Sequence, residues 1–441
     1  AQGFAQNGGA GHGWVEGGPL RQVQTEMYQA SLGVEATRAL SHIAHLIGKE
    51  EASLDLGRTA DRQRLLLDNI FWSPDQLIYA YALDSNGARV DVPSVLTTVP
   101  MWFHLLDDEH AQEMIAKLAQ PEHETDWGMR IISSRDQKYD PSGYHFGTVW
   151  PLFTGWAAVA EYAYHRPLPA YANLRANALL AFDGSLGHVA ETLSGDYNQT
   201  LSTGSPQQVW SAAMVVSPLL RGLMGLKADA VDCHLTFAPH IPAGWNTFSI
   251  DNLQIGADTV SVSYRRMPDK VSLHVRSNGA KQCTLEFSPA VSLRARITQV
   301  RLNGRKVLFH LETTSTDQHV SVNVPVSNGE SEVEIGMEGD FEFGWTPALP
   351  ALGATSTGLR ITSELWSASR DTLTVQLGGR SGENYRLFIS DSRQLSSVDG
   401  GQLEQTRDET ANVRVTFPAN VAEYSQAAVV FHLSKVYFSK R

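Results

Sequence analysis

The pattern of apolar residues changes once along this chain, and that change constrains the fold more than any other feature. Up to about Leu226 the apolar residues recur at helical spacing, whereas beyond Leu235 they alternate with polar residues over strand lengths. A chain of 441 residues is too long for one ordinary domain and can bury large cores. The sequence therefore predicts a helical domain followed by β-structure, in two or three domains.

The first part of the chain predicts seven helices. An apolar stripe that ends before a stop signal at Gly48 marks the first helix, through Val23, Met27, Ala30, Leu40, Ile43, Ala44 and Ile47. The other six helical patterns lie near residues 51–72, 93–106, 108–120, 150–164, 168–182 and 206–225. Long loops rich in Gly, Pro and Asp separate several of them, and loops of such length in a compact helical domain are usually functional.

The second part predicts β-sheet domains. Alternating segments with turn residues between them favour a β-sandwich, through "DTVSVSYRRM", "KVSLHVRS", "CTLEFSPA", "ARITQVRLNG" and "HVSVNVPV". The stretch "GDFEFGWTPALPALGATSTG" is interpreted as a linker, and five more strand patterns follow it. We place a helical domain at residues 1–230, a β-sandwich at 231–345 and a second small β-domain at 346–441. A continuation of the first sandwich is the alternative for the last domain.

Composition excludes several classes of function. The formal net charge is −12 and no basic run is present, so nucleic acid is not an expected partner. No apolar run approaches the roughly 20 residues of a membrane-spanning helix. With only Cys233 and Cys283, neither a disulfide framework nor a metal cluster is expected, and no cofactor is expected either. The sequence leaves the localisation and the oligomeric state open.

Two glutamates at loop ends are candidates for catalysis. Glu16 stands in the Gly-rich segment "GHGWVEGG", and Glu191 stands in "HVAETLSGD". Hydrolysis of a glycosidic bond needs two carboxyl groups that flank the bond, one protonated and one ionised. Sequence spacing alone does not pair these residues, because a single carboxylate is more often solvated or placed at a helix end.

Six segments, taken in order, carry a resemblance to a known family: "YHFGTVWP", "AETLSGD", "SPQQVWSAAM", "LLRGLMGLKADA", "LTFAPHIPAGW" and "NLQIGADTVSVSYRR". They resemble the end of an amylo-α-1,6-glucosidase domain of the glycogen-debranching type, which belongs to the six-hairpin, glucoamylase-type glycosidases. The likeness covers roughly residues 10–265. It implies an exo-acting glycoside hydrolase that inverts configuration and releases a terminal α-linked sugar, expected to be glucose, from an oligosaccharide or polysaccharide.

The resemblance also assigns roles to residues. Glu191 lies ahead of Trp210 and matches the family's general base, and Glu16, two residues after Trp14, matches the general acid. The segment "DWGMR" is similar to one in glucoamylases that carries a substrate-binding arginine. The implied substrate-binding set is Trp14, Glu26, Trp127, Arg130, His145, Trp150 and Trp210.

The family fold is a toroid of twelve helices, the (α/α)6 barrel, in which the acid loop precedes the sixth helix. Seven helices remain after that loop, which is the number read from this sequence. The chain is therefore expected to be a partial (α/α)6 toroid followed by β-domains. We expect the isolated chain to be incomplete, to expose apolar helix faces and to hydrolyse little substrate.

One motif departs from the family pattern. Relatives usually carry His-Asn-Gly-Thr-Val-Trp-Pro-Trp-Asp, whereas this chain has Phe146 and Phe153 in place of the amide and the carboxylate. Loss of polar partners alters which sugar hydroxyls a site can bind, so a substrate other than glycogen is expected.

Structural roles are the alternatives for several of these residues. His145 is more often a structural histidine, Trp150 before Pro151 is also a good helix start, and Arg130 is equally consistent with a structural ion pair. Two other functions stay open. A glucoside phosphorylase would replace water with phosphate and need no carboxylate base, and a carbohydrate-binding relative would have lost one carboxylate.

Overall fold

The computed structural model describes residues 3–7, 23–279, 283–405 and 410–434. The chain forms two compact units, and the boundary does not follow the sequence order. Unit 1 comprises Ala1–Pro218 and Pro347–Thr362, and unit 2 comprises Leu219–Thr346 and Ser363–Arg441. Each unit has its own elements and is described separately below.

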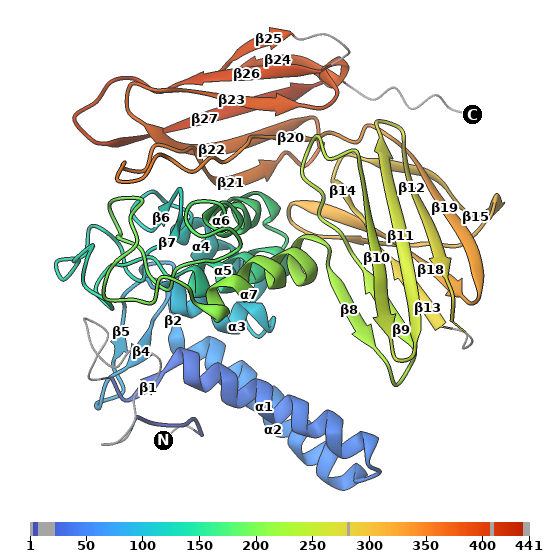
Figure 1. Cartoon of the computed structure of the whole chain (residues 1–441), viewed down its shortest axis with the longest axis horizontal. Helices are drawn as coiled ribbons and strands as arrows, with labels where there is room; N and C mark the ends of the chain where they lie inside the picture. The colour runs from blue at the N-terminus through green and yellow to red at the C-terminus, as the bar shows by residue number, and fades with distance from the viewer. Residues whose placement is uncertain (1–2, 8–22, 280–282, 406–409, 435–441) are drawn as a thin grey trace. The chain divides into compact units, whose positions relative to one another are not determined.

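The seven predicted helices are present in the described part of unit 1 (Figure 1). They are α1 (Met27–Leu46), α2 (Glu50–Phe71), α3 (Thr98–Trp102), α4 (Asp108–Leu118), α5 (Pro151–Ala163), α6 (Pro167–Leu180) and α7 (Val209–Ser217). Local signals set several of their starts. The carboxylate of Asp107 accepts hydrogen bonds from the backbone N–H groups of Glu109 and His110 at the start of α4, and a proline occupies the first turn of α5 and of α6. Closure of these helices into a toroid stays a prediction.

Three helix bounds differ from the predicted ones. Val23 precedes α1, because Thr25 and Glu26 form a short strand that pairs with Leu83 and Ala82. The helix predicted over 93–106 is only a 3-10 turn, η1 (Val95–Thr97), followed by the five residues of α3. The helix predicted over 206–225 changes after α7 into the π-turn η2 (Pro218–Leu223).

Short strands connect the helices of unit 1. They form three small sheets: β1 (Thr25–Glu26), β4 (Ala82–Leu83) and β5 (Arg89–Val90); β2 (Trp72–Ser73) and β3 (Ile78–Tyr79); and β6 (Glu124–Thr125) and β7 (Gly128–Met129). The main core packs α1, α3, α4 and α5 around fully buried side chains such as Met27, Phe71, Tyr79 and Phe153. These strands fix the entry of the loops that carry the candidate site.

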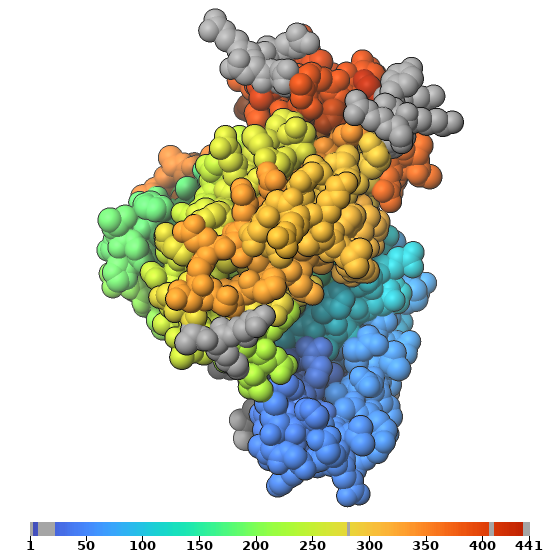
Figure 2. Space-filling model, turned by 90° about the vertical axis from the view of Figure 1, so that its right-hand side faces the viewer, coloured from blue at the N-terminus to red at the C-terminus, as the bar shows by residue number. Residues whose placement is uncertain are grey.

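The hairpin of α1 and α2 keeps much of its apolar surface in solvent. Figure 2 shows this hairpin in blue. Its exposed large apolar side chains are Leu32, Leu40, Ile43, Leu46, Ile47, Leu54 and Leu65. Such surfaces promote association. Among the described helices, none combines the length and apolarity that a membrane crossing requires.

Unit 2 begins with two packed sheets, as the alternating pattern predicts. One sheet contains, in order, β10 (Thr247–Ile255), β11 (Asp258–Met267), β12 (Lys270–Ser277), β19 (Gly329–Glu338), β15 (Arg296–Leu302) and β16 (Arg305–Lys306). The other contains β14 (Ala290–Ser292), β18 (Asp317–Val326), β13 (Cys283–Phe287), β9 (His234–Phe237) and β8 (Leu226–Asp229), with β17 (His310–Thr313) also paired to β18. Tyr264 of β11 meets Phe287 of β13 edge to face, so the inner faces interlock.

Two four-stranded sheets follow. One contains β20 (Phe343–Gly344), β23 (Asn384–Ile389), β26 (Ala411–Thr416) and β25 (Gln402–Gln405), and the other contains β21 (Arg360–Trp366), β22 (Thr372–Arg380), β27 (Tyr424–Leu433) and β24 (Leu395–Asp399). Phe343 packs on Phe431 between them, with ring centroids 5.3 Å apart. Cys233 and Cys283 form a disulfide that joins the start of β9 to the start of β13. The sequence predicted no disulfide framework, because nothing in it indicated that these two residues would meet.

The predicted linker is partly a packed strap. Residues 347–362, which we call the strap, belong to unit 1 and hydrogen-bond to its loops. Asn198 donates to the carbonyl of Pro350, and Arg175 donates to the carbonyl of Pro347. The Pro and Gly content that suggests a linker here lets an extended segment follow the surface of unit 1.

Candidate active site

Two long loops of unit 1 are joined into one structure. Isolated β-bridges link Arg130 to Val149, Val149 to Leu193, and Leu193 to Thr200. Residues 121–150 and 189–208 therefore form a single layer, which we call the loop cluster. It brings together five of the predicted site residues, Trp127, Arg130, His145, Trp150 and Glu191.

Glu191 is held by donors at both of its carboxylate oxygens. The hydroxyl of Tyr144 donates to Oε1 at 2.8 Å, and the backbone N–H of Ser205 donates to Oε2 at 2.7 Å. The backbone N–H of Glu191 in turn donates to the carbonyl of Ser205 at 2.8 Å. Glu191 is half-buried. The two hydrogen bonds from Tyr144 and Ser205 fix the orientation of the carboxylate.

Arg130 clamps three parts of the loop cluster. Its Nε donates to the carbonyl of Gly195 at 2.7 Å and to the hydroxyl of Tyr139 at 3.2 Å, and its Nη1 donates to the carbonyl of Pro121 at 2.9 Å. The same hydroxyl donates to Asp196 at 2.7 Å, and burial raises the pKa of Tyr139. A Cβ on Gly195 would lie 2.3 Å from that hydroxyl, so only glycine permits this approach. Arg130 is thus a structural clamp, and a contact with sugar stays a prediction.

His145 and Trp150 belong to an aromatic series that includes Tyr144, whose hydroxyl donates to Glu191. Trp150 lies 4.7 Å from Tyr144 and 5.7 Å from His145 between ring centroids, and its indole N–H donates to the hydroxyl of Thr148 at 3.0 Å. Only 1% of Trp150 is exposed. The structural roles that the sequence offers as alternatives for His145 and Trp150 therefore fit their burial. A side chain with so little exposed surface acts through the residues that it packs against.

The aromatic series continues toward α1. Trp150 stacks on Phe153, Phe153 packs on Trp156, and Trp156 stacks on Tyr28 with centroids 5.8 Å apart. Phe153, where relatives carry a carboxylate, is fully buried in this series, whereas Phe146 is 37% exposed. Of the two phenylalanines that replace polar residues of the motif, only Phe146 offers its ring to solvent.

Glu26 stands at the entry of α1 and is almost fully buried. The side-chain amide of Asn7 donates to its Oε1 at 2.7 Å. Burial, with a smaller effect of the Glu26 charge, raises the pKa of Tyr28 and of Tyr81. Trp210, at the start of α7, is half-buried against the main core of unit 1.

Trp127 is fully buried, which differs from the sugar-lining position that sequence suggests. Its indole N–H donates to the carbonyl of Ser194 at 2.8 Å, and its ring packs with Val149 and Leu193. A side chain with no exposed surface cannot stack on a sugar, so Trp127 joins the two loops instead. Trp14 and Glu16 lie outside the described residues.

Asp126, beside Trp127, ties the loop cluster to the strap. Its carboxylate accepts hydrogen bonds from the backbone N–H groups of Thr357 and Gly358 and from Arg360, at 2.7 to 3.0 Å. A Cβ on Gly358 would come within 2.1 Å of this carboxylate. The strap is thereby held against the segment that carries Trp127 and Arg130.

Burial shifts the pKa of two neighbouring groups in the loop cluster, Glu124 and His123. Burial raises the pKa of Glu124 to about 7 although Arg360 lies 3.5 Å away and opposes the shift. Burial lowers the pKa of His123 to about 3. Neither of the two metal-capable side-chain groups among the described residues lies in the loop cluster.

Sequence reasoning missed the partners of Glu191. Tyr144 precedes His145 in the same "YHFGTVWP" segment, and Ser205 opens "SPQQVWSAAM", so both stood in motifs already noted. A signal was available for Tyr144, since a phenol next to a family motif can hydrogen-bond a carboxylate. The N–H of Ser205 is a backbone group and leaves no mark in the sequence.

The comparisons with known proteins give a family match for the first half of the chain. Residues 12–211 match the family model of the mannosylglycerate hydrolase MGH1-like glycoside hydrolase domain. This range includes both candidate glutamates. No curated protein matches the chain.

Solved structures resemble the chain at low identity. A chain named "Sialidase" is 15% identical, with 72% of this chain and 29% of that chain covered and a TM-score of 0.54. An α-L-rhamnosidase from Dictyoglumus thermophilum is 14% identical, with 70% and 31% covered and a TM-score of 0.46. A GH63 mannosylglycerate hydrolase from Thermus thermophilus is 15% identical, with 45% and 46% covered and a TM-score of 0.37.

The sequence identity to each of these solved structures is 15% or less. The resemblance to the sialidase chain shows the fold alone, and this chain spans less than a third of the length of the first two structures. The amylo-α-1,6-glucosidase assignment stays a prediction. The family match supports the broader class, because residues 12–211 match the model of a glycoside hydrolase domain.

Proposed function

We propose that the protein is an exo-acting glycoside hydrolase that releases a terminal α-linked sugar with inversion, with Glu191 as general base and Glu16 as general acid. The observation that carries the proposal is the setting of Glu191. It is half-buried and oriented by a phenol and a backbone N–H. An inverting enzyme needs such a fixed, ionised carboxylate to deprotonate the attacking water.

The carboxyl groups of Glu191 and Glu16 must lie at a defined separation for the proposed mechanism. Inverting glycosidases keep their two carboxyl groups roughly 6.5–9.5 Å apart, which leaves room for the water. Glu191 would take a proton from the water while Glu16 protonates the leaving oxygen. Arg130, through the loops it clamps, would keep Glu191 in place. Glu26 is the substitute for Glu16 if that residue proves dispensable.

The sugar is expected to be glucose, and mannosylglycerate is a second candidate substrate. The family model that matches residues 12–211 bears the name of a mannosylglycerate hydrolase, which favours a small α-mannoside over a branched polymer. The exposed phenyl ring of Phe146, where debranching relatives carry an amide, likewise favours a small α-mannoside over a branched polymer. A glucoside phosphorylase is the alternative reaction.

One assay separates these possibilities. The protein, in its full natural length, is incubated with α-glucosides of several linkages and with α-mannosylglycerate, each with and without inorganic phosphate. NMR spectroscopy then follows the anomer of the released sugar. Free β-sugar released without phosphate supports the proposal. Sugar phosphate as the product would identify a phosphorylase, and binding without turnover of any substrate would identify a carbohydrate-binding protein.

A further inference from the structure

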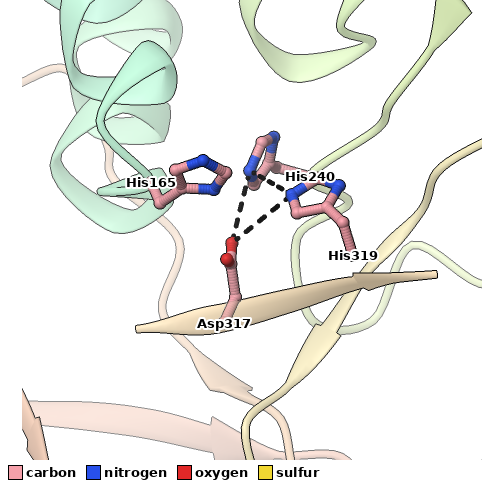
Figure 3. Close-up of side chains that lie close together, drawn as sticks. All are labelled: His165, His240, Asp317 and His319. Carbon is pink, nitrogen blue, oxygen red and sulfur yellow. Dashed lines mark hydrogen bonds and ion pairs between the residues drawn. The ribbon is translucent and has the colours of Figure 1, made fainter. Parts of the chain in front are cut away.

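Unit 2 contains a convergence of three side chains that the proposed hydrolysis does not use. His240 follows β9, and Asp317 and His319 lie two residues apart on β18, so both point to the same face of the strand. Figure 3 shows the three side chains turned toward one another. Each is less than a tenth exposed. His165, drawn in the same figure, belongs to unit 1 and is not among the ligands proposed.

One potential ligand atom of each side chain lies close to those of the other two. Nε2 of His240 lies 3.2 Å from Nε2 of His319 and 3.3 Å from Oδ2 of Asp317, and Nε2 of His319 lies 3.9 Å from the same Oδ2. A tetrahedral zinc site with Zn–N bonds of about 2.0–2.1 Å separates its ligand atoms by about 3.3 Å. Two of the three separations therefore match the edges of such a site, and the third, at 3.9 Å, is longer.

The protonation of His319 is fixed by its other nitrogen. Nδ1 lies 2.7 Å from the carbonyl oxygen of Ser288, which only accepts, so Nδ1 carries the proton. Nε2, the nitrogen that can act as a metal ligand, faces His240 and Asp317. A backbone carbonyl that accepts from the second nitrogen is the usual arrangement of a metal-binding histidine.

Asp317 is oriented in a comparable way. The hydroxyl of Thr314 donates to Oδ1 at 2.8 Å, which leaves Oδ2 facing the two imidazoles. The backbone of Asp317 is paired with Ser292 and that of His319 with Ala290, so the position of both residues is set by the sheet. His240 is held by its backbone N–H, which donates to the carbonyl of Leu223 at 2.8 Å.

We propose that His240, Asp317 and His319 bind one divalent transition-metal ion, with zinc as the expected ion. Two imidazole nitrogens and one carboxylate oxygen suit zinc better than magnesium or calcium, which prefer oxygen ligands. Water would complete the coordination. The ion would join the segment after β9 to β18, and these residues lie outside the glycoside hydrolase match. A hydrogen-bonded cluster that holds a single proton and no ion is the competing state.

The test uses the tag-free chain in non-reducing buffer, which keeps the cysteines in their disulfide and removes them as competing ligands. After treatment with a chelator and its removal, the protein is titrated with Zn²⁺, and the bound metal is measured by mass spectrometry after gel filtration. We expect one zinc ion per chain and a thermal midpoint raised by roughly 5 °C or more at a hundredfold excess over Kd. Co²⁺ should give visible absorption bands of a tetrahedral or five-coordinate site.

Variants locate the ion. Asp317→Asn and His319→Gln should lose the stoichiometric zinc, the Co²⁺ bands and the thermal shift. His274→Gln is the matched control, because His274 lies on an exposed part of β12 and pairs with Glu330. It should bind zinc as the parent chain does. Absence of zinc binding by the folded parent chain, or equal binding by all four proteins, would overturn the proposal even if one variant failed to fold.

Discussion

Glu191 in unit 1 and Asp317 in unit 2 are both oriented carboxylates, but their oxygens face different partners. Both oxygens of Glu191 accept from N–H or O–H donors. Asp317 accepts from Thr314 at one oxygen, while its other oxygen faces His240 and Nε2 of His319. A carboxylate with donors at both oxygens is stable as an anion by itself, whereas one that faces imidazole nitrogens needs a shared proton or a cation.

Two further carboxylates of unit 1 extend the comparison. Asp126 is buried and has backbone N–H groups and Arg360 at its oxygens. Glu124 is buried with Arg360 at 3.5 Å, and its pKa rises to about 7. The number and nearness of donors thus separates a carboxylate that anchors the strap from a carboxyl whose pKa is raised by burial.

The largest expected effect is on catalysis. Glu191→Gln keeps the shape of the side chain and removes the proton acceptor, so kcat should fall by roughly 10²–10⁴-fold. Initial rates of sugar release measure the change. Glu113→Gln, at an exposed position of α4, is the control and should keep the parent rate. An active Glu191→Gln variant would show that Glu191 is an anchored structural carboxylate like Asp126.

The second effect is on stability. Asp126→Ala leaves Arg360 buried without its 2.7 Å partner and removes the acceptor for two backbone N–H groups of the strap. Loss of one member of a buried ion pair costs about 3–5 kcal/mol. Denaturant unfolding should show that loss, while Asp61→Ala on the exposed face of α2 should stay within about 0.5 kcal/mol of the parent. Equal stability of the two variants would mean that the strap is not anchored through Asp126.

Periodicity was sufficient to predict the seven helices of unit 1 and the main strands of unit 2, but not the short strands β1 to β7. The seven helices and the strands such as β11 and β12 follow from spacing alone, because one face of each must be buried. The motifs also predicted that Arg130, His145, Trp150 and Glu191 lie in functional loops, and the β-bridges place these loops together. Which of these residues contact a sugar stays a prediction.

Contacts between distant segments were not predictable. The strap looked like a linker because its hydrogen bonds to Asp126 and Asn198 depend on the fold of residues far away in sequence. The histidine and aspartate cluster depends on a loop and a strand separated by 79 positions between His240 and His319. The buried Trp127 was misplaced for a related reason, since sequence does not tell a buried aromatic from one that lines a cleft.

A third test uses the pH dependence of stability. Glu124 has a folded-state pKa near 7 against an ordinary value of 4.5, so the folded protein retains a proton that the unfolded chain releases. Its contribution is fully present below about pH 4.5 and is lost as the pH rises through about 7, a change of about 3 kcal/mol. Glu124→Gln should remove this decline. The unfolding free energies of variant and parent are compared at pH 5 and at pH 8. A difference between the two proteins that is the same at both pH values would contradict the raised pKa of Glu124.

The smallest expected effect separates orientation from packing at Glu191. Tyr144→Phe removes the hydroxyl that donates to Oε1 and keeps the ring that packs on Trp150. A hydrogen bond to a charged acceptor is worth about 1.5–3 kcal/mol, so kcat should fall by about 10- to 150-fold, with little change in thermal midpoint. The double variant with Glu191→Gln is the decisive comparison. If the hydroxyl acts by orienting Glu191, Tyr144→Phe should have no further effect once Glu191 is a glutamine, whereas an additive loss would mean that Tyr144 acts on the substrate directly.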